Sequence, residues 1–305
     1  MVEKRNAARA AGNSWGEWGE SDELGALNRL QPEAIVAAAR LVREGRTISL
    51  SIPLDDAPDR PRLPQRAAPR HLMASDGGDF LAGRKREGSA FISEDYLFLC
   101  VHEGTHIDAL SHVGAEGYIY NGFSADSVTS GGAQHCGMDR VSGIVGRGVF
   151  LDALALVGGP CLDVGFAIDS AVIRRCCQRQ DLELAAGDTV YIRTGWMRAH
   201  DQRGLGLEVG EPGLDLDGGI YLAQAGVAAI GMDNFGIEPY ALNSHRSFRP
   251  VPVHIELLRN RGMYLLEFCD LDELAASGRS TFLSVIAPLR IAGGAGSPVN
   301  PLAIL

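Results

Sequence analysis

The densest group of chemically capable side chains in the sequence is HEGTHIDALSH, which runs from His102 to His112. Its first five residues fit H-E-x-x-H, the zinc-protease pattern, in which a helix places both histidines on one face and the glutamate acts as the base. Gly104 and Thr105 are weak helix formers in the middle of that turn. The apolar stretch YLFLCV just before it is typical of a buried strand. The sequence therefore disfavours a helical protease site.

An extended or irregular backbone gives the same stretch a different chemistry. His106 and Asp108 are two residues apart, so an extended chain points both side chains to one side. Gly104 permits a bend that brings His102 to them. Two imidazoles and one carboxylate suit Zn²⁺ or Mn²⁺ with positions left open for water. His112 would then stand beside the metal as a proton carrier, and ordinary polar residues on a loop are the alternative.

Composition narrows the class of protein. The chain has 305 residues, a formal net charge of −10 and 46% hydrophobic residues. The acidic balance argues against nucleic acid or an anionic membrane surface as the main partner. No apolar run reaches the length of about 18 residues that a membrane span needs, and no apolar segment typical of a secretory signal follows the N-terminus. The six cysteines never form C-x-x-C and are expected to be reduced core thiols. We expect a cytoplasmic enzyme with a small-molecule substrate.

An alternation of strands and helices must position these residues. Several expected strands are apolar on both faces, as interior strands are. The expected strands are residues 47–54, which alternate polar and apolar side chains, and residues 96–101, 148–154, 188–195, 227–233, 263–268 and 282–291. Helical patterns occupy residues 32–45, 169–179, 218–226 and 252–260, and the first begins with Pro32 and stops at Gly45.

The remaining segments are expected to be loops. Residues 55–90 carry many Pro, Arg, Asp and Gly residues and indicate a long loop or flap. GGA and GAGSP near the C-terminus indicate turns. We expect an α/β fold with one large domain at residues 47–305, preceded by an arm and helix over residues 1–46.

The ligand stretch resembles the H-x-G-T-H-x-D-x-x-x-H signature of the cyclase family of metal-dependent hydrolases. That family includes bacterial kynurenine formamidases and isatin hydrolases. Four further segments resemble the family in the right order: GDTVYIRTGW (187–196), IGMD (230–233), VHIELLRNRGMYLLEFCDLDEL (253–274) and PLRIAGGAGSPVNPLAI (288–304). The N-terminal WGEWGESDELGALNRLQPE resembles a longer-armed branch. Leu110 and Asn300 stand where Pro and Arg are common, which tells against the substrate of the kynurenine formamidases.

The resemblance implies a site for one or two divalent ions, Zn²⁺ or Mn²⁺. Its ligands would be His102, His106, Asp108, His254 and Glu267. Asp108 would bridge the two ions, and His112 would be the catalytic acid/base. The implied fold is a swivelling-type α/β domain that assembles as homodimers or homotetramers.

The local sequence supports two of these assignments. Glu267 lies in the apolar segment MYLLEF, where an unpaired carboxylate costs several kcal/mol. A core salt bridge with an arginine is the alternative for Glu267. His254 follows Pro252 at an expected helix start, where its side chain can face a cleft. A plain surface histidine is the alternative for His254.

Other side chains are candidates for supporting roles. Asp233, at an expected strand end, either positions substrate or a ligand histidine, or caps a turn. Three aromatic residues are candidate pocket walls, with a place in the core as the alternative: Tyr120, Trp196 and Phe235.

Together these features predict a hydrolase that uses a metal-activated water. His112 would take a proton and pass it to the leaving nitrogen or oxygen. The resemblance suggests cyclic amides, lactones or N-formyl anilides as substrates. The longer arm and Leu110 favour ring opening of a small cyclic amide or lactone, with an arylformamidase as the alternative. A non-catalytic metal- or ligand-binding protein on the same scaffold is the alternative of another class.

Overall fold

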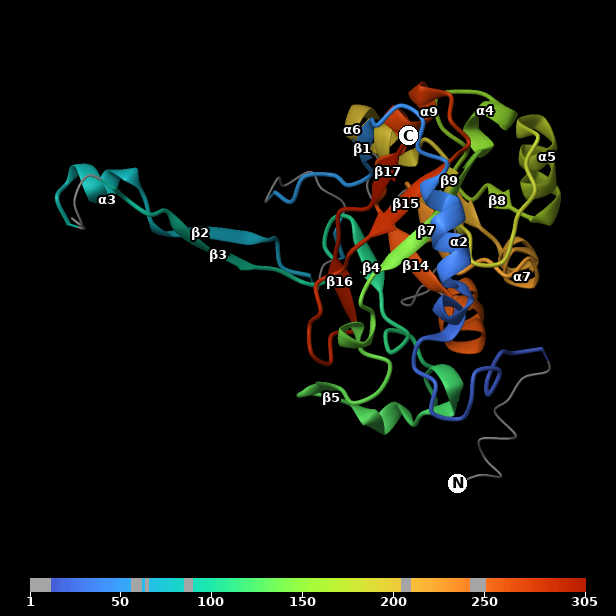
Figure 1. Cartoon of the computed structure of the whole chain (residues 1–305), viewed down its shortest axis with the longest axis horizontal. Helices are drawn as coiled ribbons and strands as arrows, with labels where there is room; N and C mark the ends of the chain where they lie inside the picture. Colours follow the sequence, from blue (N-terminus) through green and yellow to red (C-terminus); the bar gives the residue numbers. More distant parts are fainter. Residues whose placement is uncertain (1–11, 56–61, 64–65, 85–89, 204–209, 242–250) are drawn as a thin grey trace.

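The computed structural model describes residues 12–55, 62–63, 66–84, 90–203, 210–241 and 251–305. In this part of the chain nine strands form one mixed sheet, with helices packed around it (Figure 1). The strand order is β1 (Thr47–Ser49), β17 (Leu302–Ile304), β15 (Thr281–Ile286), β7 (Ile144–Asp152), β9 (Thr189–Arg193), β12 (Ala229–Met232), β14 (Tyr264–Glu267), β4 (His106–Asp108) and β16 (Gly296–Pro298). The predicted α/β class is confirmed.

The centre of the sheet is its most buried part. β7, β9, β12 and β14 run parallel, and Ile230 of β12 lies between Val190 of β9 and Leu265 of β14. All three side chains are fully buried. These strands are apolar on both faces because elements on either side exclude water from them, as is usual for parallel sheets.

Aspartate side chains cap the start of several helices. Asp169 accepts a hydrogen bond from the backbone N–H of Val172, and Asp215 accepts one from Gly218, at two helix starts. The α-helices are α2 (Pro32–Ala39), α3 (Gly77–Leu81), α4 (Ala153–Val157), α5 (Ser170–Gln180), α6 (Trp196–Arg203), α7 (Leu216–Gln224), α8 (Pro252–His254) and α9 (Asp272–Ser277). A π-helical segment, η5 (Ile255–Asn260), continues α8. Within the described residues, none of these helices is long and apolar enough to span a membrane.

Short 3₁₀ turns and small ladders complete the fold. The turns are η1 (Gly25–Arg29), η2 (Tyr120–Gly122), η3 (Ala125–Ser127) and η4 (Met138–Arg140). The small ladders pair β5 (Val128–Thr129) with β6 (Gly132–Ala133), β8 (Ala167–Ile168) with β11 (Gly213–Leu214), and β10 (Gly210–Glu211) with β13 (Tyr240–Ala241). Each of these ladders is separate from the nine-stranded sheet.

The first predicted helix is shorter than expected. The pattern predicted a helix over residues 32–45, but α2 ends at Ala39. The backbone N–H groups of Leu41 and Val42 bond to carbonyls three residues back, which tightens the chain into a turn. The backbone N–H of Gly45 then donates to the carbonyl of Leu305. The end of the segment that was expected to be helical is therefore bonded to the C-terminal residue instead.

Two predictions between residues 55 and 101 were wrong. Within the expected loop 55–90, the structure forms β2 (Arg70–Ser75) and α3. The expected buried strand 96–101 is instead β3 (Glu94–Phe98), which pairs only with β2 in a hairpin that projects from the body (Figure 1). All five residues of β3 are exposed within this chain. Apolar composition indicates that a segment needs cover, but it does not say which surface provides it.

The C-terminal turn prediction was also incomplete. GAGSP contributes β16, which pairs antiparallel with β4 and places Gly296 opposite Asp108. Glycine and proline weaken the strand signal, yet pairing with an inner strand overrides that local preference.

The N-terminal segment packs against the main body. The buried indole of Trp15 donates from Nε1 to the carbonyl of Arg259 at 2.6 Å. The hydroxyl of Tyr120 donates to Asp22 Oδ2 at 2.9 Å. Tyr120 is fully buried, so it anchors this segment in the core and is not a pocket wall. The domain boundary at residue 46 stays a prediction.

Candidate metal centre

β4 places the central ligands of the candidate site. His106 lies opposite Glu267 in the ladder with β14, and Asp108 follows two residues later on the same side of the strand. Residues 101–105 form turns and bends, with Gly104 at a φ of +61°. The predicted extended geometry is therefore observed, and the helical protease arrangement does not occur.

Three histidines surround one oxygen of the Asp108 carboxylate. Oδ1 of Asp108 lies 3.4 Å from Nε2 of His102, 3.7 Å from Nε2 of His106 and 3.9 Å from Nε2 of His112. The other oxygen, Oδ2, lies 3.5 Å from Nε2 of His254. The Asp108 carboxylate is therefore the common centre of the cluster.

Glu267 closes the cluster from the end of β14. Its Oε2 lies 3.2 Å from Nε2 of His106, and its Oε1 lies 3.2 Å from Nε2 of His254. The structure thus brings together all six residues that the sequence nominated, from segments at residues 102–112, 254 and 267.

Two groups within the cluster have the geometry of cation sites. The first is His102, Asp108 and His112, and the second is Asp108, His254 and Glu267, with the ligand atoms of each group within 4.8 Å of one another. Asp108 belongs to both groups, as the bridging assignment requires. His112 takes the place in the first group that was expected for His106, so the division into ligands and acid/base stays a prediction.

Unpaired polar atoms show that these residues fit a divalent cation. Nε2 of His102, Nε2 of His106 and both carboxylate oxygens of Asp108 are buried without a hydrogen-bond partner among the described residues. Burying such atoms unpaired is costly. Cations bound in the two groups would give partners to Nε2 of His102 and to the Asp108 oxygens, and the mixed imidazole–carboxylate set suits Zn²⁺ or Mn²⁺.

The two central carboxylates are held in their charged form. Burial would raise the pKa of Asp108, but the surrounding histidines, His112 foremost, hold it far below its usual range. Burial would likewise raise the pKa of Glu267, but His106 and His254 outweigh it and lower that pKa to about 2. The site therefore presents two negative charges to a cation at neutral pH.

The histidines fall into two electrostatic classes. Burial lowers the pKa of His102 to about 3, and burial also lowers the pKa of His112. Burial acts in the same direction on His106 and His254, but neighbouring carboxylates outweigh it and raise the pKa of both above the ordinary value. His102 and His112 are thus neutral at pH 7, whereas His254 carries a proton that a cation must displace.

Glu238 holds His254 in position, and the sequence reading missed it. Its Oε2 lies 2.7 Å from Nδ1 of His254, and its Oε1 accepts the backbone N–H of His254 at 2.9 Å. A carboxylate on Nδ1 leaves Nε2 facing the site, which is the usual support of a metal-bound histidine. The available signal was an acidic residue directly before Pro239, shortly after the end of β12.

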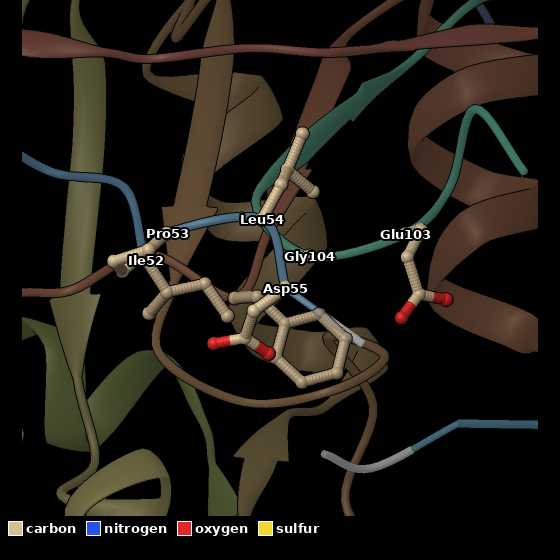
Figure 2. A pocket seen from close by; sticks show the side chains of 7 residues that line it. Ile52, Pro53, Leu54, Asp55, Glu103 and Gly104 are labelled. Carbon is tan, nitrogen blue, oxygen red and sulfur yellow. The ribbon is translucent and has the colours of Figure 1, made fainter. Parts of the chain in front are cut away.

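Glu103, which would be the base in a protease site, forms an ion pair with an arginine instead. Nη2 of Arg62 pairs with Glu103 Oε1 at 2.7 Å, and both side chains are largely buried. Nη1 of Arg66 donates to the carbonyl of His102 at 2.7 Å. In Figure 2 the segment that carries Leu54 passes beside Gly104, and the Glu103 carboxylate lies to the right of that crossing. Two arginines thus fix the loop that carries His102.

An apolar wall lies beside the cluster. Trp196, Phe235 and Phe268 pack together, and the Phe268 ring centroid lies 6.5 Å from that of His106. A shallow hollow, open to solvent, adjoins this wall. It is lined by Ile52, Pro53, Leu54, Asp55, Glu103, Gly104 and Phe268 (Figure 2).

Asp233 caps a turn. Its Oδ1 accepts the N–H and the hydroxyl of Thr194, and its Oδ2 accepts the N–H of Gly195, each at 2.7 Å. Of the two roles considered for Asp233, the structure supports this one, because the carboxylate holds the loop after β9.

Comparison with known proteins agrees with this geometry. The sequence model of the Cyclase family matches residues 48–239, which is more than half of the chain and includes the whole stretch from His102 to His112. The chain belongs to the Cyclase family. A crystal structure of a novel cyclase is 32% identical and covers 96% of this chain and 97% of its own, with a TM-score of 0.87.

More distant relatives of this Cyclase-family chain carry a more specific name. Isatin hydrolase from Roseibium aggregatum is 24% identical over 220 residues, which cover 70% of this chain and 76% of that protein. Isatin hydrolase A from Labrenzia aggregata, in a structure bound to benzyl benzoate, is 24% identical with a TM-score of 0.60. It covers 91% of this chain and 98% of its own. At that identity the structural likeness shows the shared fold.

Proposed function

We propose that this protein is a metal-dependent hydrolase that opens a small cyclic amide or lactone. The observation that carries the proposal is the convergence of four buried polar atoms without partners, from His102, His106 and Asp108, beside His254 and Glu267. The isatin hydrolase relatives support hydrolysis of a cyclic amide.

The cluster residues would hold Zn²⁺ or Mn²⁺ and set the charge of the site. Such an ion lowers the pKa of a bound water from 15.7 to about 7 and polarises a carbonyl, which supplies the nucleophile and the electrophile. Asp108 and Glu267, both ionised, balance its positive charge. Glu238 keeps the Nε2 atom of His254 directed at the site.

His112 has the properties of the proton carrier. Its side chain is 26% exposed, whereas those of the other five cluster residues are 1–8% exposed. Because burial lowers its pKa, the imidazole is neutral at pH 7 and can accept a proton. It would then deliver that proton to the leaving nitrogen or oxygen of the opened ring.

The surroundings favour a small, flat substrate. The hollow beside Gly104 and Phe268 is shallow and has a volume of about 10 Å³, little more than one water molecule needs, so it offers no long groove. Of the neighbouring aromatic cluster, Phe268 borders this hollow. A peptide would need a longer groove, and the Arg62–Glu103 pair removes the base that peptide cleavage would use.

Metal analysis combined with a substrate panel tests the proposal. The panel consists of isatin, a small lactone, an N-formyl anilide and casein. We expect turnover of a ring substrate by metal-loaded protein and none of casein. Preference for the formyl anilide would indicate an arylformamidase, and no turnover of any amide or ester by metal-loaded protein would indicate a binding protein.

The variant His112→Ala separates chemistry from binding. We expect it to retain metal while turnover falls by about 10²–10⁴-fold, the usual contribution of a general acid/base. His135→Ala is the matched control, because His135 pairs with Glu23 outside the cluster. Loss of metal from His112→Ala would instead make His112 a ligand.

A further inference from the structure

The loop after β12 is closed by one buried side chain, that of Asn234, which is 0% exposed. Its Oδ1 accepts the backbone N–H of Ile237 at 3.2 Å. Its Nδ2 donates to the carbonyls of Ile237 and Pro212 at 3.2 Å and 2.9 Å. The amide of Asn234 therefore binds both backbone groups of Ile237 and ties the loop to the residue directly before β11.

Ile237 has a backbone conformation that needs such support. Its φ of +59° lies in the left-handed region, which β-branched residues rarely adopt. A residue of this kind keeps that conformation only where its surroundings over-determine it. The carbonyl of Ile237 also accepts the N–H of Leu214 at 2.8 Å, whereas its own N–H donates to Asn234. The left-handed conformation of Ile237 therefore depends on the Asn234 amide.

The direction in which the chain leaves Ile237 decides where Glu238 points. Glu238 is the next residue, and its carboxylate bonds to Nδ1 and to the backbone N–H of His254 at 2.7 Å and 2.9 Å. Gly213 packs against the same segment, because a Cβ atom added to it would overlap the carbonyl oxygen of Ile237. The segment is thus confined on that side, and Asn234 fixes it from within the loop.

The backbone of Asn234 also reaches the second carboxylate beside His254. Its carbonyl accepts the N–H of Phe268 at 3.1 Å. Phe268 has a φ of +54° and directly follows Glu267, whose Oε1 lies 3.2 Å from Nε2 of His254. The two carboxylates that face the ring nitrogens of His254 therefore each adjoin a left-handed residue that is bonded to Asn234. Of these two links, the one to Ile237 uses the side chain of Asn234, so a substitution can test it.

We infer that Asn234 is a positioning residue of the metal centre, which holds Ile237 in its left-handed conformation and thereby aims Glu238 at His254. Because the bonds of its side chain go to backbone groups, Asn234 acts through Glu238 and does not bind a cation itself. The inference rests on the proposed function, since it takes His254 as a metal ligand. A purely structural role, in which Asn234 stabilises the fold without affecting the site, is the alternative.

The variant Asn234→Ala separates the two roles when it is compared with Asn121→Ala. Asn121 is also 0% exposed, and its amide bonds to the backbone of Gly16, Gly19 and Asp22 in the N-terminal segment. Both variants should lower the melting temperature, because both remove the hydrogen bonds of a buried amide. Asn234→Ala should also weaken Zn²⁺ binding by about 10–100-fold, as expected for loss of support to a metal-bound histidine. Asn121→Ala should change that affinity by less than about threefold.

A second substitution tests whether the backbone of Ile237 is the link. Glycine adopts positive φ readily, so Ile237→Gly should keep the loop conformation without support from Asn234. In that background Asn234→Ala should weaken Zn²⁺ binding by less than about threefold. Competition with a coloured chelator gives the dissociation constants, and visible absorption of the Co²⁺-loaded protein reports the ligand geometry. The two proteins with glycine at this position also carry the comparison if Asn234→Ala alone does not fold.

The possible results separate this inference from the proposed function. A folded Asn234→Ala protein with the wild-type affinity for Zn²⁺ overturns the inference and leaves the metal centre in place. So does a double variant that fails to fold, or one that binds Zn²⁺ about tenfold or more weakly than Ile237→Gly, because the backbone of Ile237 would then not be the link. A wild-type chain that binds neither Zn²⁺ nor Mn²⁺ overturns the proposed function, and this inference with it.

Discussion

Gly296 offers a sharp test of the metal centre, because it lies next to the candidate ligand His102 but has no side chain that could bind a metal. It pairs with Asp108 across the β4–β16 ladder. A Cβ atom added at this position would lie 2.7 Å from Nε2 of His102 and 2.9 Å from the carbonyl oxygen of Ile107. Ordinary contacts begin at 3.4 Å, so in Gly296→Ala the imidazole must move away by about 0.7 Å.

The magnitude follows from how strictly metals fix their ligands. Metal–nitrogen distances hold within about 0.2 Å, so a shift of this size removes His102 as a ligand. Loss of a residue that supports a metal ligand lowers metal affinity by about 10–100-fold. Loss of the ligand itself should lower metal affinity by at least about 100-fold. Crowding of β4 should cost a further 1–3 kcal/mol or so in the free energy of unfolding.

Competition with a coloured chelator measures the affinity, and circular dichroism with thermal unfolding reports the fold. Gly143→Ala is the control, because its added Cβ would lie 3.7 Å from the carbonyl of Ile286, an ordinary contact. His102→Ala removes the ring without crowding Ile107 and should show a similar loss of affinity. If Gly296→Ala folds and binds Zn²⁺ or Mn²⁺ as tightly as the wild-type chain, His102 is not a ligand in this geometry.

Three further outcomes follow from the electrostatics of the site. Because its carboxylate neighbours raise the pKa of His254 well above the ordinary value, metal binding at pH 7 should release a proton. Affinity should then rise with pH up to that pKa, and calorimetry in buffers of different ionisation enthalpy measures the release; pH-independent affinity would contradict it. Glu238→Gln should weaken metal binding by about 10–100-fold and reduce the proton release, because it removes the charge beside Nδ1. Glu103→Gln should change turnover only mildly, since Arg62 already occupies that carboxylate, and complete loss of turnover with metal retained would show that Glu103 takes part in the chemistry.

The parts of the fold that could be predicted were those whose signal is local. Val190, Ile230 and Leu265 lie in runs that are apolar on both faces, and such runs report interior strands wherever they occur. The alternation of His106 and Asp108 gave the correct side of β4 because a strand repeats every two residues.

The parts that could not be predicted depend on distant partners. YLFLCV has the composition of an interior strand, yet its first three residues lie in the exposed strand β3, because composition does not specify which surface will cover an apolar segment. Glu238 lies 16 residues before His254, so neither a helix nor a strand repeat relates the two. Only the loop after β12 brings them together. Gly296 and Pro298 have weak strand propensity, and their pairing with β4 is decided by the rest of the sheet.

The β14–β4–β16 ladder also determines when the ligands can meet during folding. Glu267, His106 and Pro298 are neighbours across these three strands, although they lie far apart in the sequence. The unfolded chain therefore lacks the complete site, and a cation would meet all of its candidate ligands only after these long-range pairings have closed. Its binding free energy then adds to native stability, by about 2.7 kcal/mol when the free ion is at 100 times its dissociation constant. In this arrangement a bound ion would join the segments at residues 102–112, 254 and 267, and a chelator would act as a mild denaturant of the sheet edge.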